Sequence, residues 1–132
     1  MANLLITDLA NYFQAATWTN LGKPQFFKYN TEVIKKLPTL LILQGSIKGV
    51  FSSNDDSLTI YECEMRLILK VRNETDTQKG FTDITELMKD FANNNRTIND
   101  PTIDLNNQPS DKKIFESTFD YTITLIKNKG TW

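Results

Sequence analysis

The clearest alternation of apolar and polar residues runs from Tyr61 to Arg72. Every second residue from Tyr61 to Val71 is apolar or a cysteine, whereas the positions between them are mostly charged: Glu62, Glu64, Arg66, Ile68, Lys70 and Arg72. Successive side chains of a strand point to opposite faces, so the pattern predicts one core face and one charged face. At about 3.3 Å per residue the strand spans on the order of 40 Å, and we expect part of it to project beyond the domain.

Two other stretches predict strands of the same sheet. Residues 40–43 are a continuous apolar run that follows Pro38 and is too short for a helix. Gly45 follows two residues after the end of this run, which indicates a strand that continues past a bulge. Near the C-terminus, residues 115–127 alternate again, with Phe119, Tyr121 and Ile123 on one face.

Two segments have the helical period instead. Residues 4–16 place apolar side chains at helical spacing after Asn3, a suitable N-cap. Residues 83–93 place four apolar side chains on one stripe, and Asp83 with Glu86 forms a possible capping box at its start. We expect the two helices to pack on one face of the sheet through Leu9, Phe13, Leu87 and Phe91.

The segment between the second helix and the last strand is predicted to be a long polar loop at residues 94–113. It is too polar to join a core, yet it contains Ile98, Ile103 and Leu105 as spaced apolar residues. We expect it to be mobile in the free subunit and to order against a partner through these three residues. The chain is thus predicted to be a single α+β domain over residues 1–132, with a mostly antiparallel sheet and helices on one face.

Composition excludes several classes of protein. Fifteen basic and sixteen acidic residues give a net charge of −1, which argues against a dedicated nucleic-acid binder. Aromatic and basic residues do alternate around Phe26, Phe27 and Tyr29, but we favour a loop that folds these rings onto the core. The first residues do not form a signal peptide, and no apolar stretch approaches the roughly 20 residues of a membrane span. The single cysteine, Cys63, fits a reducing compartment and a buried position.

The sequence offers little catalytic chemistry. It contains no histidine, the commonest general base and metal ligand, and no glycine-rich phosphate loop. Asp55 and Asp56 lie in a predicted turn without the ligand ladder of a calcium loop. Glu62 and Glu64 would lie about 6–7 Å apart on one strand face, but nothing in the sequence would raise the pKa of either. We therefore predict no catalytic residues, no metal site, no cofactor and no enzymatic activity.

The order of elements resembles that of the tail terminator proteins of long-tailed bacteriophages, of the lambda minor tail protein U type. The resemblance rests on an N-terminal helix, the strand "LPTLLILQG", the long strand "LTIYECEMRLILKVR", a helix with an Ile-x-x-Leu-Met-x-x-Phe stripe, and the final strand "FESTFDYTITLIKN". It covers most of the chain, from about Leu4 to Lys127, and is one of pattern and length.

The resemblance implies a structural virion protein that is assembled in the host cytoplasm and located in the virion tail. Such proteins form a ring, expected to be a homohexamer, at the head-proximal end of the tail tube. The ring stops tube polymerisation and provides the docking surface for head-completion proteins. Its partners would be other copies of itself, the tail tube protein and a head-completion protein, with DNA only passing through the lumen and no membrane involved.

The charged face of the long strand suggests how such a ring could close. Head-to-tail contacts require two different complementary patches on each subunit. We hypothesise that Glu62 and Glu64 form one patch and that Arg66, Lys70 and Arg72 form the other, contacting a neighbouring subunit or the tail tube. The alternative is a solvated face with cross-strand pairs, for example Asp120 or Glu116 opposite Arg66 or Lys70.

Other functions stay open at the level of sequence. The chain could be another head–tail or neck connector component, which would share the size, the lone cysteine and the missing catalytic residues. It could also be a small cytosolic regulatory or immunity-type binding protein. Neighbouring genes would discriminate between these alternatives: capsid, portal or tail-tube genes favour a virion protein, and a toxin gene favours the binding protein.

Overall fold

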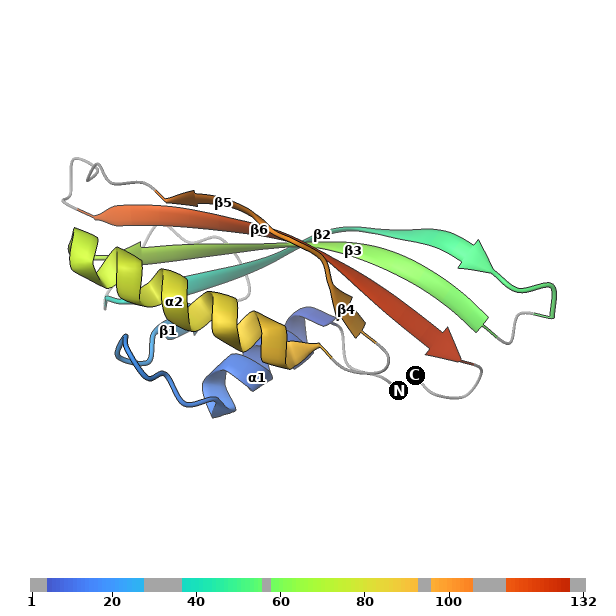
Figure 1. Ribbon diagram of the computed structural model, residues 1–132, viewed down its shortest axis with the longest axis horizontal. Coiled ribbons are helices and arrows are strands. Elements are labelled where there is room, and N and C mark those ends of the chain that lie inside the picture. Colours follow the sequence, from blue (N-terminus) through green and yellow to red (C-terminus); the bar gives the residue numbers. More distant parts are fainter. Residues whose placement is uncertain (1–4, 28–36, 56–57, 93–95, 106–113, 129–132) are drawn as a thin grey trace.

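A long sheet with two helices against one half of it forms the whole of the described structure (Figure 1). The computed structural model describes residues 5–27, 37–55, 58–92, 96–105 and 114–128. The element order is α1 (Leu5–Ala15), β1 (Gln25–Phe27), β2 (Thr39–Ser52), β3 (Leu58–Val71), α2 (Glu74–Phe91), β4 (Arg96–Ile98), β5 (Thr102–Leu105) and β6 (Phe115–Asn128). The prediction of a single α+β domain is confirmed.

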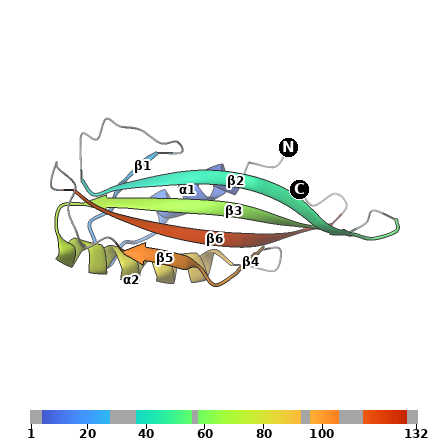
Figure 2. The same ribbon diagram turned by 90° about the horizontal axis from the view of Figure 1, so that it is seen from above.

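The sheet is built around β3, which pairs antiparallel with β2 on one side and with β6 on the other. Each of these three strands has 14 residues, and Figure 2 shows them running side by side. The short strand β1 pairs parallel with the start of β2, while β4 and β5 pair antiparallel with different parts of β6. The sheet is therefore mixed but mostly antiparallel, and the three predicted strands are all present. The predicted bulge after residue 43 is also present, as a register shift between Gln44 and Ile47.

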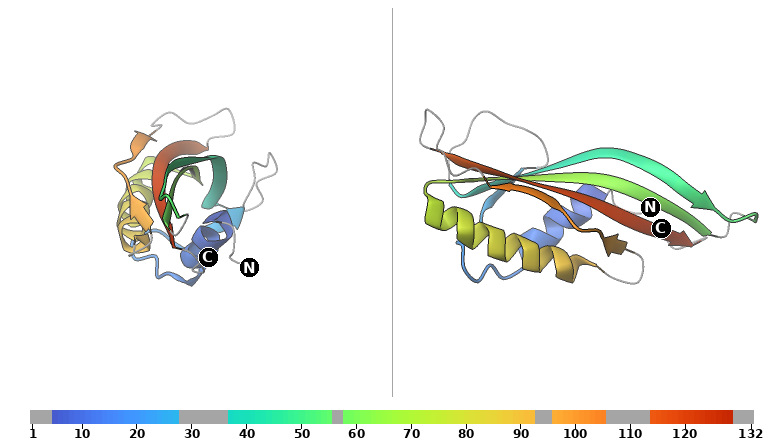
Figure 3. Two further views of the ribbon diagram at one scale, coloured as in Figure 1. Left: turned by 90° about the vertical axis from the view of Figure 1, so that its right-hand side faces the viewer. Right: turned by 45° about the horizontal axis from the view of Figure 1, so that its top comes forward.

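The helices cover one face of the sheet through the predicted apolar side chains. Leu9 and Phe13 of α1 and Phe91 of α2 are buried in the core, and Leu87 packs against it. Aromatic contacts join the elements: Tyr12 meets Phe91 between the helices, with ring centroids 5.2 Å apart. The end-on view in Figure 3 shows both helices on the same side of the twisted sheet. Neither helix of the described residues is long and apolar enough to cross a membrane.

The start of α2 differs from the prediction. The helix begins at Glu74, nine residues before the predicted start at Asp83, and the polar stretch before Asp83 forms its first turns. Asn73 is the N-cap, and its side chain accepts a hydrogen bond of 2.8 Å from the backbone N–H of Asp76. The capping box of Asp83 and Glu86 is therefore wrong. Gly80 lies where α2 approaches the sheet most closely, since a Cβ there would collide with the side chain of Leu69.

The prediction of an irregular loop at 94–113 is wrong for seven residues. Arg96–Ile98 and Thr102–Leu105 are strands that extend the sheet beside β6. Arg96 fixes the first of them to the end of α2, because its Nε donates to the Phe91 carbonyl at 3.1 Å and its guanidinium lies 3.9 Å from the centroid of the Phe91 ring. The remaining residues of this segment lie outside the described residues, except for those that connect the two strands.

The helices cover only part of the sheet's length. Along β2, the first four residues are buried and the last eight, from Gly45 to Ser52, are exposed. The far ends of β2 and β3 and the end of β6 continue past the helices as a three-stranded extension (Figures 1 and 3). We call this extension, formed by residues 45–52, 58–60 and 126–128, the arm, and the helix-covered remainder the body. The expected projection of the long strand is thus observed.

Candidate interaction surface

The charged face of β3 is the face turned away from the helices. Cys63, Met65 and Leu67 alternate toward the core, so Glu62, Glu64 and Arg66 point the other way. The same face of β6 carries Glu116, Thr118, Asp120, Thr122 and Thr124, because these residues pair in register with the charged positions of β3. The sequence prediction of one core face and one charged face is confirmed.

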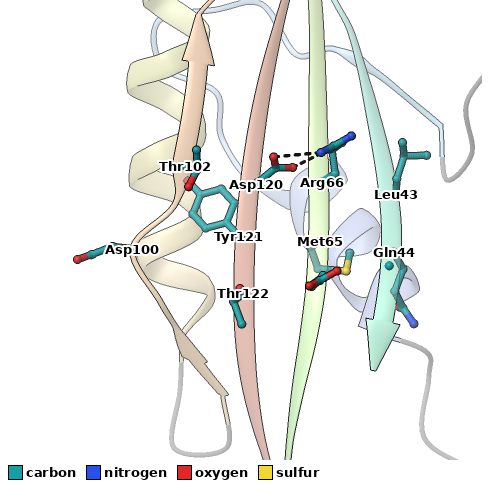
Figure 4. Close-up of a pocket in the computed structure, with 11 residues that line it drawn as sticks. Leu43, Gln44, Met65, Arg66, Asp100, Thr102, Asp120, Tyr121 and Thr122 are labelled. Atoms are coloured by element: carbon teal, nitrogen blue, oxygen red, sulfur yellow. Dashed lines mark hydrogen bonds and ion pairs between the residues drawn. The ribbon is translucent and has the colours of Figure 1, made fainter. Parts of the chain in front are cut away.

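Two of the five predicted interface residues are paired within the subunit. Arg66 lies opposite Asp120, and its Nε and Nη2 donate to the two carboxylate oxygens at 2.7 and 3.2 Å (Figure 4). The hydrogen bond and charge of Asp120 raise the pKa of the Arg66 guanidinium. Lys70 lies opposite Glu116, with an Nζ–Oε2 distance of 3.7 Å. The alternative of cross-strand pairs is therefore the arrangement observed for Arg66 and Lys70.

The other three charged residues have no ion pair among the described residues. Glu62 pairs in register with Lys48 of β2 and Thr124 of β6, without a salt bridge to either. Glu64 is exposed beside Gly45, whose missing side chain leaves room for it: a Cβ there would lie 3.2 Å from the Glu64 Cβ. Arg72 is exposed just beyond the end of β3. Their contact with a neighbour stays a prediction.

A shallow groove of about 460 Å³ crosses this charged face at the centre of the sheet. The Arg66–Asp120 pair forms its floor, Leu43 and Gln44 line one side, and Asp100 and Thr102 line the other (Figure 4). Within the described part of the chain, no three acidic, cysteine or histidine residues cluster as metal ligands. The groove offers charged and polar contacts, and Arg66, the cationic side chain of its lining, is already paired with the Asp120 carboxylate.

The three apolar residues of the predicted partner-contacting loop pack against their own subunit. Ile98 pairs with Ile123, while Ile103 and Leu105 pair with Phe119 and Ser117, so all three face the helix side of the sheet. Each is partly buried against the core cluster. The premise that this segment is too polar to join the core is wrong, and its apolar residues are accounted for without a partner.

Cys63 and the aromatic residues after Pro24 occupy the structural positions that we favoured. Cys63 is fully buried, and burial, with a smaller contribution from Glu64, raises the pKa of its thiol to about 11. Phe26 stacks on Phe13 at a centroid distance of 6.2 Å and lies 5.9 Å from Trp18. The predicted packing of this ring onto the core is confirmed, but the expected loop is wrong for Gln25–Phe27, which form β1 and pair with β2. Tyr29 lies outside the described residues.

The surface that sequence reasoning missed is the apolar edge of the arm. The large apolar side chains exposed by the described structure are Ile47, Val50 and Phe51, at 48%, 44% and 52%. A signal was present in the sequence: two helices of this length cannot cover strands of 14 residues, so some strand residues had to stay uncovered. Which residues those would be depended on the position of the helices, and that position is a tertiary property.

Comparisons with known proteins do not assign this arrangement to a family. No protein-family model matches the chain, and no curated protein matches its sequence. Function must therefore be argued from the surfaces described above.

Proposed function

We propose that this chain is a structural virion protein of the tail-terminator kind. It would form a ring at the head-proximal end of a phage tail tube, stop tube polymerisation and present a docking surface for head-completion proteins. The observation that carries the proposal is the arm, a stretch of sheet that extends past its own core with apolar side chains exposed. Soluble monomers rarely expose clustered apolar side chains without an interaction to bury them.

The geometry of the arm supports contact between molecules rather than within one. Two of its strands, β3 and β6, are held in continuous register with the body: Glu62 pairs with Thr124 and Leu58 with Asn128. A three-stranded extension of this kind points away from the body (Figure 1) and cannot fold back without breaking those pairs. Among the described residues no segment covers Val50 and Phe51, which favours their burial by a second molecule.

The charged residues of β3 support the same proposal, but fewer of them are available for a contact between subunits than the sequence suggested. Arg66 and Lys70 already have carboxylate partners in the subunit, so they add less to a subunit seam than the sequence alone suggested. Glu62, Glu64 and Arg72 are the charged residues of the strand that can still meet opposite charges on a neighbour. Such contacts would set the register of the ring more than its affinity.

The test is assembly of the purified protein, measured by size exclusion with light scattering and by negative-stain electron microscopy. The proposal expects rings of uniform subunit number, formed alone or on addition of a tail tube protein. It also expects tubes grown in the presence of the chain to be shorter and capped at one end. A chain that stays monomeric at all concentrations and leaves tube growth unchanged would contradict the proposal. A toxin gene beside it would then direct attention to the binding-protein alternative.

A further inference from the structure

The exposed apolar residues of the arm are Ile47, Val50 and Phe51, and we call the adjacent pair Val50 and Phe51 the knob. Ile47 pairs with Cys63 and so faces the helix side of the sheet, whereas Phe51 pairs with Ile60 and faces the opposite side. The parallel partner strand β1 ends at the pair of Phe27 with Leu41, so among the described residues β2 is the outermost strand of the arm. Apolar side chains on both faces of an edge strand suit insertion into a groove better than contact with a flat surface.

The body of the same chain carries an apolar groove of about 540 Å³. It lies between α2 and the connection from β4 to β5, and its apolar lining comprises Phe81, Met88, Ala92, Ile98, Pro101 and Tyr121. The volume is in the range of roughly 300–1,000 Å³ that is usual for ligand pockets, which is enough for an aromatic ring with a neighbouring aliphatic side chain. Figure 1 shows α2 beneath the sheet of the body, whereas the arm points away from the body. The knob of a molecule therefore cannot reach the groove of the same molecule.

We propose that Val50 and Phe51 of one copy insert into the groove between α2 and β4–β5 of the next copy. The inference rests on the proposed self-assembly and names the surfaces that would carry it. The Phe51 ring would meet the partly exposed side chains of Phe81, Ile98 and Pro101, and contact between the two aromatic rings adds to the burial of apolar surface.

The charges around the two surfaces are complementary. On the arm, the exposed residue Lys48 precedes the knob. On the body, the exposed residue Asp100 belongs to the groove lining. Contact of Lys48 with Asp100 would fix the orientation of the inserted strand and disfavour the reversed insertion.

This contact joins two different surfaces, so it is heterologous. Repetition of one heterologous contact produces a closed ring when the rotation closes and an open filament when it does not. A knob and a groove on opposite parts of one chain therefore generate a ring without a second protein when that rotation closes.

The first experiment compares two substitutions that add the same charge to the same strand. Phe51→Asp should raise the dissociation constant of the assembly at least about 30-fold, because buried aromatic residues at interface centres are energetic hot spots. Ser46→Asp, at an exposed position of β2 outside the knob, is the matched control and should assemble as the wild type does. Circular dichroism checks that both variants are folded. Equal assembly of the two variants would overturn the inference and leave the proposed ring intact.

The second experiment maps the contact by disulfide trapping. Val50→Cys chains are mixed with Lys89→Cys chains under mild oxidation, with buried Cys63 left in place. The expected product is a mixed dimer, and Glu86→Cys, which is exposed on α2 but does not line the groove, should not trap Val50→Cys. Trapping of two Val50→Cys chains with each other as the main product would show an arm-to-arm contact and overturn the inference. A wild type that never self-associates would overturn both this inference and the proposed function.

Discussion

The body and the arm are two halves of the same three strands with opposite relations to solvent. In the body, β2 begins with four buried residues, and the matching parts of β3 and β6 supply Leu67, Leu69 and Phe119 to the core. In the arm, the same strands stay paired, with two register shifts in β2, but have no helix over them (Figure 3). Strand pairing thus continues from the body into the arm, whereas burial of side chains under the helices ends with the body.

One part of the sheet thus stabilises the fold, and the other part is left for interaction with another molecule. Burial of apolar side chains is the main stabilising contribution to a fold, so the body must supply most of the stability of the chain. The arm is held by strand pairing and by its continuity with the body, and its apolar side chains gain little until another molecule covers them. Substitutions in the two halves should therefore separate the stability of the fold from self-association.

Truncation of the same residue type in the two halves should have very unequal effects. Phe119 is fully buried and stacks on Phe81 at a centroid distance of 6.5 Å. Phe119→Ala should lower the free energy of unfolding by about 3–5 kcal/mol, because it removes a large buried ring and leaves a cavity. Urea unfolding followed by circular dichroism measures this loss. A loss below about 1 kcal/mol would mean that the body does not carry the stability assigned to it.

Asp83 of α2 holds the segment after α1 to the body through several hydrogen bonds. Its carboxylate accepts hydrogen bonds from the backbone N–H of Leu21 at 2.7 Å, from the N–H and side chain of Asn20, and from the Thr19 hydroxyl. Burial acts to raise the pKa of Asp83, but these hydrogen bonds outweigh it, and the pKa is lowered from 3.8. Asp83→Asn should cost about 1.5–3 kcal/mol near neutral pH, since it weakens several bonds to a buried charge.

The pH dependence of that cost has a definite sign. The folded state holds Asp83 with a lower pKa than the unfolded state, so its contribution is present above pH 4 and is lost as the pH falls below about 4. The wild type and Asp83→Asn should therefore converge in stability in acid. Unfolding curves measured between pH 2 and 7 test this, and a difference that stays constant down to pH 2 would contradict the assignment.

Truncation in the arm should leave the fold almost unchanged. Phe51 is 52% exposed, so Phe51→Ala should lower the free energy of unfolding of the monomer by less than about 1 kcal/mol. The same substitution should weaken self-association clearly, which makes it the counterpart of Phe119→Ala. Unfolding at low protein concentration separates the two effects, and a large loss of monomer stability would show that the arm belongs to the folding core.

The smallest effect is expected on the charged face. Arg66→Gln removes a pair whose two side chains are 56% and 42% exposed, and exposed pairs contribute little and are screened by salt. The melting temperature should be nearly unchanged at physiological ionic strength. A clear fall in assembly at an unchanged melting temperature would show that Arg66 also contacts a neighbour.

The strands were predictable because their signals are local. The alternation in β3 and β6 specifies both faces, and the opposition of Arg66 to Asp120 and of Lys70 to Glu116 follows once the two strands pair. The apolar stripes of the two helices were equally readable. What these elements share is a repeated period over many residues.

The missed features depend on tertiary contacts or on capping. The first turns of α2 are mostly exposed, with only Thr77 and Gly80 buried before Asp83, so no apolar stripe marked them; Asn73 as an N-cap was the available signal. Short strands such as β4 and β5 exist because β6 offers them an edge, although Ile103 and Leu105 at a spacing of two did indicate a strand. The knob on the arm could not be located because exposure depends on where the helices end.

The bulges in β2 have a consequence for how such a chain can change. Register shifts lie between Gln44 and Ile47 and between Gly49 and Phe51, and they place Ile47 and Phe51 on opposite faces of the sheet. Each shift is one extra residue on β2, and such an extra residue bends the strand and increases its twist. Deletion of the extra residue would leave the later pairs of β2 with β3 in place but would straighten the strand locally. A change in length by one codon therefore alters the direction of the arm without a single substitution in the folding core.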